Sequence, residues 1–189
     1  MKGNGTYFNN SPKYNKDLIL NQYNNGERLE FLLFFGASKG TLNEGCLSQW
    51  QKSNFTVNNI EYSCTEQFMM ACKAELFNDL DAIKKILNNN NPKSIKALGR
   101  KIKKFDENTW NENKYSIVLK GNYYKFNQNE NMKKILIDTK NKVLVEASPY
   151  DKIWGVGLSE NDEKINNPNN WKGDNLLGFA LMEVRDMIK

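Results

Sequence analysis

Short apolar runs along the chain predict a few strands. Residues 29–35 (LEFLLFF) are an aromatic-rich apolar run that ends at a glycine, which is typical of a buried strand. Residues 142–147 (KVLVEA) predict a second strand. Residues 55–57 and 60–62 flank the pair Asn58-Asn59, and we expect a tight hairpin there because asparagine tolerates a positive φ.

Apolar residues at helical spacing fill much of the remaining chain. We expect helices over about residues 64–77, 79–87, 92–102, 111–126, 129–139 and 176–188. Asn78 or Asp79 is expected to cap the second of these helices, and Pro92 takes the first position of the third. The predicted fold class is a helix-rich α+β domain with a few short strands.

Three stretches lack such a pattern. Residues 1–27 are rich in Asn, Gly and Tyr, so we expect a flexible, low-complexity N-terminal extension before a domain over residues 28–189. Residues 149–175 form a Gly/Asn/Pro-rich loop. Residues 36–51 also look like a loop, and a loop of that length is uncommon unless it is functional or disordered.

Composition narrows the chemistry more than the fold. The 189 residues, 39% of them hydrophobic, suit one domain with a real core, and the net charge is only +5. Histidine is absent, which excludes Ser-His-Asp and Cys-His catalysis and most zinc sites. Any chemistry must therefore rest on carboxylates, amines, hydroxyls and aromatic platforms.

Cysteine usage and the lack of long apolar runs indicate a cytoplasmic protein. Cys46, Cys64 and Cys72 are odd in number and form no C-x-x-C pair, which favours a reducing compartment over a disulfide framework. The N-terminus does not resemble a signal peptide, and no apolar run approaches the roughly 20 residues of a membrane span. We expect no membrane partner.

One candidate segment lies directly after the expected hairpin. Glu66 falls in the first turn of a helix, and Lys73 lies seven residues later on roughly the same face. A carboxylate and an ammonium on one face can frame a small polar substrate. The alternative is structural, because Ser63 and Glu66 have the spacing of a capping box, which explains an acid here without catalysis.

A second candidate segment leaves the strand at residues 142–147. Asp151 precedes a Trp154-Gly155 pair by three residues, so an acid can sit beside an aromatic platform while Gly155 lets the backbone approach a ligand. The structural alternative is a turn in which Asp151 bonds to local N–H groups and Trp154 fills the core. Arg100 and Trp110 are further candidates, for a phosphate contact and for ring stacking, with solvated surface and core as their alternatives.

Seven short motifs follow one another along the chain. They are Phe34-Phe35, Leu47-Ser48-Gln49-Trp50, Thr65 to Met70 with Lys73-Ala74, Leu98-Gly99-Arg100, Trp110, Asp151 to Gly155, and Asn175 to Arg185. In this order they resemble the NADAR (YbiA-like) family over about residues 30–187. Seven motifs in the family's order are hard to produce by chance.

Two departures from the family pattern fall in the loop after Leu47. Gln49 stands where the family usually has Asn, and Trp50 where it usually has Phe. Substrate contacts of the Ser48-Gln49-Trp50 loop are therefore expected to differ from the family's. Residues 156–171 also depart from the common Gly-rich loop, which leaves substrate choice open.

The resemblance implies an N-glycosidase that hydrolyses the C–N bond at a ribose anomeric carbon. In this interpretation Glu66 orients or deprotonates water, and Asp151 holds a ribose hydroxyl or stabilises the cationic transition state. The implied substrate-binding residues are Trp154 and Trp110, which wall or stack the leaving base, and Lys73 and Arg100, which attract phosphate. The scheme requires no metal or organic cofactor.

The resemblance leaves three functions open. The first is hydrolysis of a small ribosyl phosphate, such as the phosphoribosylated amines of riboflavin synthesis. The second is removal of ADP-ribose from guanine in nucleic acid, toward which the net charge of +5 leans slightly. The third is a binding module that recognises ADP-ribose-like ligands without turnover.

Overall fold

A computed structural model of the chain describes residues 8–38 and 42–189. The α-helices in these ranges are α1 (Lys16–Asn24), α2 (Thr65–Leu76), α3 (Leu80–Leu87), α4 (Pro92–Gly99), α5 (Glu107–Gln128), α6 (Glu130–Asp138) and α7 (Leu176–Ile188). The strands are β1 (Phe31–Phe34), β2 (Phe55–Val57), β3 (Ile60–Tyr62) and β4 (Val143–Glu146). The short 3-10 helices are η1 (Glu44–Leu47), η2 (Glu163–Asn166) and η3 (Pro168–Asn170). The predicted helix-rich α+β class with a few short strands is confirmed.

The strands form two separate pairs. β1 and β4 are parallel, with Phe31 opposite Val143 and Phe34 opposite Glu146. Parallel strands need a long crossover, and here it contains α2 to α6. Because both strands run in the same direction, the segments that follow β1 and β4 leave the pair at the same end.

The second pair is the predicted hairpin. β2 and β3 are antiparallel, and Asn58 and Asn59 at its tip have φ values of 50° and 64°. Two successive positive φ angles are what a two-residue hairpin turn requires, and asparagine adopts them more readily than most residues. The hairpin delivers the chain directly into α2.

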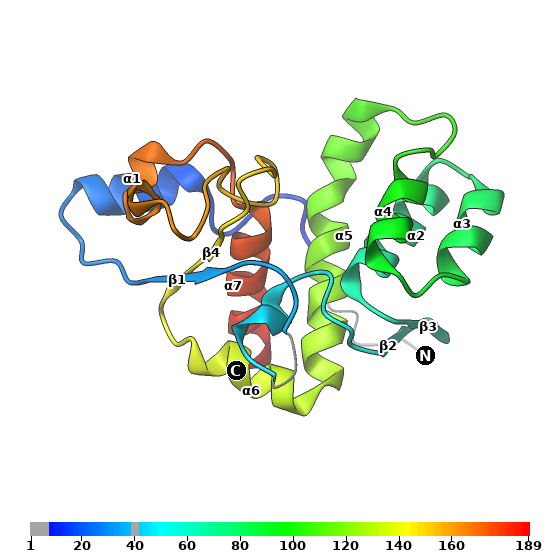
Figure 1. The fold of residues 1–189 in the computed structure, drawn as a ribbon, viewed down its shortest axis with the longest axis horizontal. Coiled ribbons are helices and arrows are strands. Elements are labelled where there is room, and N and C mark those ends of the chain that lie inside the picture. The colour runs from blue at the N-terminus through cyan, green and yellow to red at the C-terminus, as the bar shows by residue number, and fades with distance from the viewer. Residues whose placement is uncertain (1–7, 39–41) are drawn as a thin grey trace.

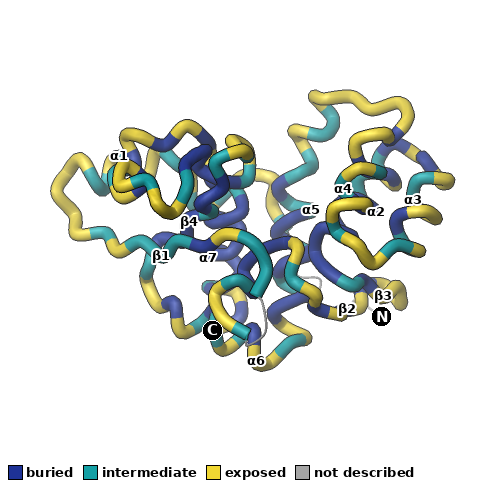
Figure 2. The backbone as a smooth tube through the Cα atoms, in the orientation of Figure 1, coloured by how far each residue is buried: buried dark blue, intermediate teal, exposed yellow. Residues whose placement is uncertain are grey.

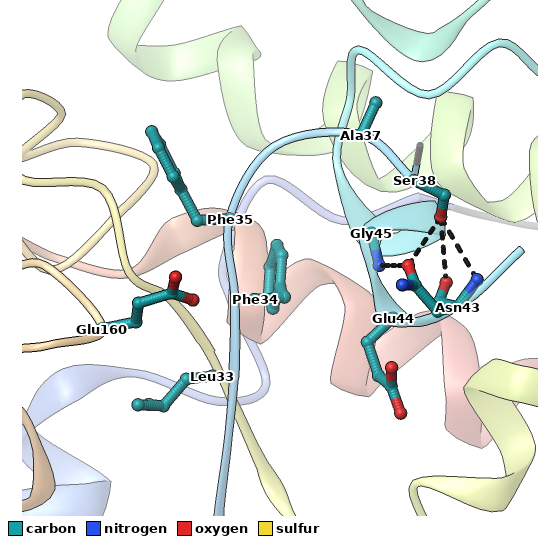
Figure 3. Close-up of a pocket in the computed structure, with 9 residues that line it drawn as sticks. All are labelled: Leu33, Phe34, Phe35, Ala37, Ser38, Asn43, Glu44, Gly45 and Glu160. Atoms are coloured by element: carbon teal, nitrogen blue, oxygen red, sulfur yellow. Dashed lines mark hydrogen bonds between the residues drawn. The ribbon is translucent and has the colours of Figure 1, made fainter. Parts of the chain in front are cut away.

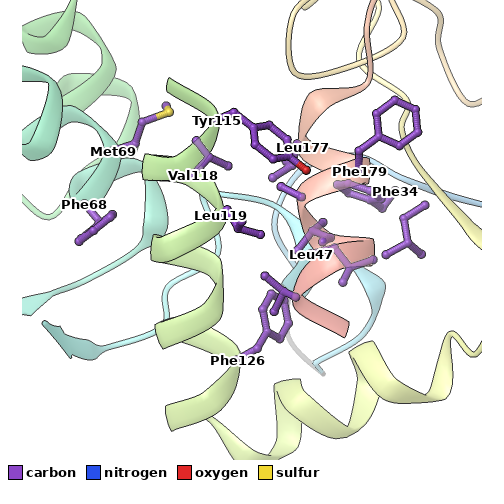
Figure 4. Packing of buried hydrophobic residues seen from close by; sticks show 14 of the residues in the cluster. Phe34, Leu47, Phe68, Met69, Tyr115, Val118, Leu119, Phe126, Leu177 and Phe179 are labelled. Atoms are coloured by element: carbon purple, nitrogen blue, oxygen red, sulfur yellow. The ribbon is translucent and has the colours of Figure 1, made fainter. Parts of the chain in front are cut away.

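Helix α5 lies at the centre of the molecule (Figure 1). The β1–β4 pair and α7 lie on one side of it, and α2, α3 and α4 lie on the other. Figure 2 shows buried residues concentrated along α2, α7 and β4, with further buried residues of α5 between Tyr115 and Phe126. In Figure 4 apolar side chains such as Leu119 and Leu177 fill the space between α5 and α7, Phe179 lies beside Phe34 on the other side of α7, and Phe68 and Met69 pack on the α2 side. This central helix joins the two sides that carry the candidate acids.

The N-terminal extension is packed where it is described. Residues 8–27 include α1, which is capped by Asn15 and buries Ile19 to 1% exposure. The Lys16 ammonium donates to the Trp171 carbonyl at 2.7 Å, and Tyr14 donates to Asp186 on α7 at 2.7 Å. The loosely attached extension expected from composition is therefore not observed from residue 8 onward; residues 1–7 lie outside the described part.

Smaller differences concern helix ends and loops. α5 begins at Glu107, earlier than expected, because the Asp106 side chain caps it by accepting from the Thr109 N–H at 2.8 Å. α4 ends at Gly99, so that the buried Ile102 lies beyond it rather than on its face. The expected loops contain η1 and the pair η2 and η3; residues 39–41 of the first loop lie outside the described part. None of the helices in the described ranges is both long and apolar enough to cross a bilayer.

Candidate active site

Glu66 projects from the first turn of α2 into the interior. It is 2% exposed, and its Oε2 accepts a hydrogen bond from Trp50 Nε1 at 3.3 Å. Its backbone N–H donates to the Gln49 carbonyl at 3.0 Å, which fixes the start of the helix against the preceding loop. The second carboxyl oxygen, Oε1, is buried and has no hydrogen-bond partner among the described residues. Glu66 is thus held in place while one oxygen stays unused.

The capping box expected from Ser63 and Glu66 is wrong. The N-cap of α2 is Cys64, one residue later than that pattern requires. Gln67 instead turns back, and its Oε1 accepts from the Ser63 backbone N–H at 2.7 Å and the Ser63 hydroxyl at 3.0 Å. The capping box therefore does not explain the acid at position 66.

The surroundings of Glu66 shift its ionisation toward neutral pH. Burial raises the pKa of the Glu66 carboxyl to about 7, because a charge in the interior loses its hydration. Lys96, the Trp50 N–H and Arg100 lower this pKa, and Asp151 raises it. A carboxyl with a pKa near 7 can accept or donate a proton at neutral pH.

Asp151 lies in the loop after β4 and uses its two oxygens differently. Oδ1 accepts from the backbone N–H groups of Ile153 and Trp154, at 3.0 and 2.9 Å. Oδ2 lies 3.9 Å from the Lys96 ammonium. The turn expected as the structural alternative is therefore present. It occupies only one oxygen, however, and leaves the charged group facing α4.

Lys96 links the two acids electrostatically, and sequence analysis missed it. It acts on the pKa of Glu66 and pairs with Asp151, and its ammonium lies 6.0 Å from the centre of the Trp50 ring. It reaches this position because α4 packs closely on α2: a Cβ on Gly99 would lie 1.9 Å from Met70 Sδ. The acids from α2 and from the β4 loop therefore share one charged neighbourhood.

A buried lysine fixes the loop that carries Ser48, Gln49 and Trp50. Lys125 on α5 is 0% exposed, and its ammonium donates to the carbonyls of Cys46 at 2.6 Å and Ser48 at 2.8 Å. Within the loop, the Ser48 hydroxyl accepts from the Trp50 backbone N–H at 3.2 Å. Lys125 was not anticipated, because a lysine on a helix with many polar residues usually lies in solvent. It positions the loop from which Trp50 reaches Glu66.

We expect Lys125→Met to destabilise the protein by about 1–3 kcal/mol, since each buried carbonyl left without a donor costs about that much, partly offset by relief of ammonium burial. Urea unfolding measures this loss. Lys120→Met on the same helix is the matched control, because Lys120 is only partly buried and its replacement should stay within about 0.5 kcal/mol. Equal losses for both variants would show that the two carbonyl contacts contribute nothing specific.

Lys73 and Trp110 form a separate group. The Lys73 ammonium donates to the Gly99 carbonyl at 3.2 Å and lies over the rings of Phe105 at 4.2 Å and Trp110 at 5.2 Å. Burial lowers the pKa of Lys73. This side chain is already satisfied by protein groups, and it is not among the charges that act on Glu66. Arg100, by contrast, is exposed at the end of α4 and does act on Glu66.

Trp154 and Gly155 serve the packing of the Asp151 loop. Trp154 is partly buried against the core. A Cβ on the buried Gly155 would lie 2.8 Å from the Glu146 carbonyl oxygen and 3.1 Å from that of Asp151. The glycine thus allows the loop to fold back closely onto the end of β4. The same edge carries Glu146, a third acid that sequence analysis did not single out.

A hollow of about 380 Å3 opens where β1 ends (Figure 3). Phe35, which is 52% exposed, and Glu160 lie on one side of it, and Ser38, Asn43 and Gly45 lie on the other. None of Glu66, Glu146 and Asp151 lines the hollow, but Phe34 at its wall is the strand partner of Glu146. In the ranges 8–38 and 42–189, no cluster of three His, Cys, Asp or Glu side chains is placed to hold a metal ion.

Comparison with known proteins gives a consistent family. Residues 33–189 match the NADAR domain. The chain is 43% identical over 163 residues to N-glycosidase R617 of Acanthamoeba polyphaga mimivirus, covering 83% of this chain and 95% of that protein. It is 28% identical over 145 residues to an N-glycosidase of Nostoc punctiforme, covering 77% of this chain and 86% of that protein.

A solved structure shares the fold. The NMR structure of E. coli YbiA superposes with a TM-score of 0.67 at 24% identity, covering 85% of this chain and 86% of that one. The domain match spans most of the chain, and the viral relative is similar over nearly its whole length. The chain therefore belongs to the NADAR family.

Proposed function

We propose that this protein is an N-glycosidase that hydrolyses the C–N bond between a ribose anomeric carbon and its nitrogen substituent. The observation that supports the proposal is that Lys96 lies 3.9 Å from Asp151 and also acts on the pKa of Glu66, so that two acids from distant parts of the chain share one charged neighbourhood. The names of the viral and cyanobacterial relatives, both N-glycosidases, support the same reaction.

The chemistry of this bond suits two carboxyl groups. As the C–N bond breaks, positive charge develops on the sugar, and a nearby carboxylate stabilises it. Asp151 supplies this charge, because its Oδ1 is held by two backbone N–H groups while Oδ2 faces the charged neighbourhood of Lys96. Glu66 activates the attacking water, and its pKa of about 7 is matched to that task at neutral pH.

The surroundings of the acids suit a phosphorylated ribosyl substrate. Lys96 and the exposed Arg100 bring positive charge next to Glu66, which attracts phosphate. Trp50 is 39% exposed while its N–H holds Glu66, so its ring offers a face to a sugar or base. Trp154, in the loop that carries Asp151, forms a wall for the base in this proposal. Lys73 supports α4 through its hydrogen bond to the Gly99 carbonyl, and its ammonium lies over the Trp110 ring.

A substrate panel tests the proposal. The protein is incubated with phosphoribosylated amines of the riboflavin type and with ADP-ribosylated guanosine, and free amine or base is measured by chromatography. We expect release from one of the two classes, and the class that is cleaved identifies the substrate. Tight binding of ADP-ribose without release from either class would contradict the enzyme and favour a binding module.

A further inference from the structure

Glu146, the last residue of β4, has a side chain that the fold does not use. The residue is partly buried, and its Oε2 is a buried oxygen without a hydrogen-bond donor in the described part of the chain. Its backbone is fixed on both sides, since its N–H donates to Asn175 Oδ1 at 3.0 Å and its carbonyl accepts from the Val156 N–H at 3.0 Å. A buried polar atom without a hydrogen-bond partner destabilises the folded protein, so its presence in a rigid part of the fold indicates a functional role.

The charged groups around Glu146 are those of the proposed active site. They are Asp151 from the following loop, Lys96 from α4 and Glu66 from α2. Burial, together with the charges of Asp151 and Glu66, raises the pKa of Glu146 to about 8, and Lys96 opposes this rise. The pKa of Glu146 lies above that of Glu66, so at neutral pH Glu146 holds its proton more firmly than Glu66 does.

We propose that Glu146 is the general acid of the reaction, which protonates the leaving nitrogen while Glu66 serves as the base. This inference rests on the N-glycosidase function proposed above and assigns a role that neither Glu66 nor Asp151 fills. Two neighbouring carboxyl groups with one proton between them are a recurring solution for cleavage of glycosidic bonds.

The proposed step balances as follows in atoms and electrons. The C–N bond breaks, its electron pair stays on nitrogen, and the Glu146 carboxyl proton is transferred to that nitrogen. Water adds to the anomeric carbon and gives its proton to the Glu66 carboxylate. The products are ribose with a new hydroxyl and the free amine or base, and proton exchange through solvent returns Glu146 to its acid form and Glu66 to its base form.

The pH dependence of turnover tests this assignment. We expect kcat/KM of the unaltered protein to fall above about pH 8, where Glu146 loses its proton. Glu146→Gln should lower turnover by about a hundredfold or more and should abolish this alkaline fall. The matched control is Glu30→Gln, an exposed glutamate just before β1 at the opposite end of the same strand pair, which should leave the profile unchanged.

The outcomes separate this inference from the function on which it rests. If the unaltered protein releases no base or amine from any substrate, the N-glycosidase function fails. If it does so and Glu146→Gln keeps either the full rate or the alkaline fall, only the role of Glu146 fails. A substrate with a pyridinium leaving group provides a second test that needs no variant, because that group departs without a proton. Its cleavage should not slow at alkaline pH. The same alkaline fall as for other substrates would overturn the assignment.

Thermal unfolding measured at a series of pH values tests the ionisation of Glu146 independently of turnover. Because the pKa of Glu146 is raised from 4.5 to about 8 on folding, the folded protein holds a proton that the unfolded chain releases between these values. The unaltered protein should therefore lose stability relative to Glu146→Gln as pH rises through this window, with a constant difference above it. A difference that does not change with pH would show that Glu146 ionises normally and would overturn its role as acid.

Discussion

The Glu66→Gln protein is expected to fold normally and to turn over substrate at least about a hundredfold more slowly, because general acid–base help contributes about 10²–10⁴-fold. Glutamine keeps the size of the side chain and an oxygen that can accept from Trp50 Nε1, but it cannot take a proton from water. The start of α2 is capped by groups other than Glu66, so the helix should not suffer. Steady-state kinetics and circular dichroism measure the two halves of this prediction.

The dependence of turnover on pH below neutrality provides a further test of the role of Glu66. Turnover by the unaltered protein should decline below about pH 7, where Glu66 becomes protonated, and the variant should lack this decline. Glu75→Gln is the matched substitution, since Glu75 is exposed near the other end of α2. Full turnover by Glu66→Gln, or an equal loss in Glu75→Gln, would remove Glu66 from the mechanism.

Asp151→Asn should reduce kcat by about 10²–10³, the range for losing one charge-stabilising group in a transition state. Asparagine still accepts the hydrogen bonds from Ile153 and Trp154, so the turn should persist while the negative charge is lost. The loss should fall mainly on kcat, because positive charge on the sugar develops in the transition state rather than in the bound substrate. Steady-state kinetics separates kcat from KM.

A similar turn further along the same loop provides the comparison. The Asp162 side chain accepts from the Lys164 backbone N–H at 3.1 Å and begins η2. Asp162→Asn should therefore show the cost of changing such a turn without changing the charge near Lys96. If the melting temperatures of both variants fall by the same amount and kcat is unchanged in both, Asp151 is a turn residue and its charge is irrelevant to catalysis.

The local elements could be predicted where local chemistry decides them. The turn at Asn58 and Asn59 follows from the tolerance of asparagine for positive φ. The Asp79 and Asn91 caps and Pro92 at the first helical turn set the starts of α3 and α4. These signals lie within a few residues of the structure that they specify, so they can be recognised in one sequence.

Predictions were wrong where a distant contact or a one-residue shift decided the outcome. Helix α1 lies in an Asn-rich segment with little amphipathic pattern, and its attachment depends on contacts such as that between Lys16 and Trp171, 155 residues apart. The spacing of Ser63 and Glu66 fits a capping box, but α2 begins one residue later and Gln67 makes the return contact.

Three residues of the proposed site could not be recognised from the sequence, because their roles also depend on distant contacts. Lys96 and Lys125 lie on helices with many polar residues, where a solvent-exposed lysine is the usual expectation. Only the fold shows that Lys96 faces Asp151 and that Lys125 is fully buried. Glu146 ends a strand with a polar residue, as many strands do. Its electrostatic effect on Glu66 depends on how the two sides of the fold are placed around α5.

The most direct test is a crystal structure of the Glu66→Gln protein with an uncleaved N-ribosyl substrate. We expect the anomeric carbon to lie between the side chain at position 66 and the Asp151 carboxylate, with the leaving nitrogen toward Glu146. A ribose bound away from both residues, with Asp151 engaged only in its own turn, would contradict this expectation.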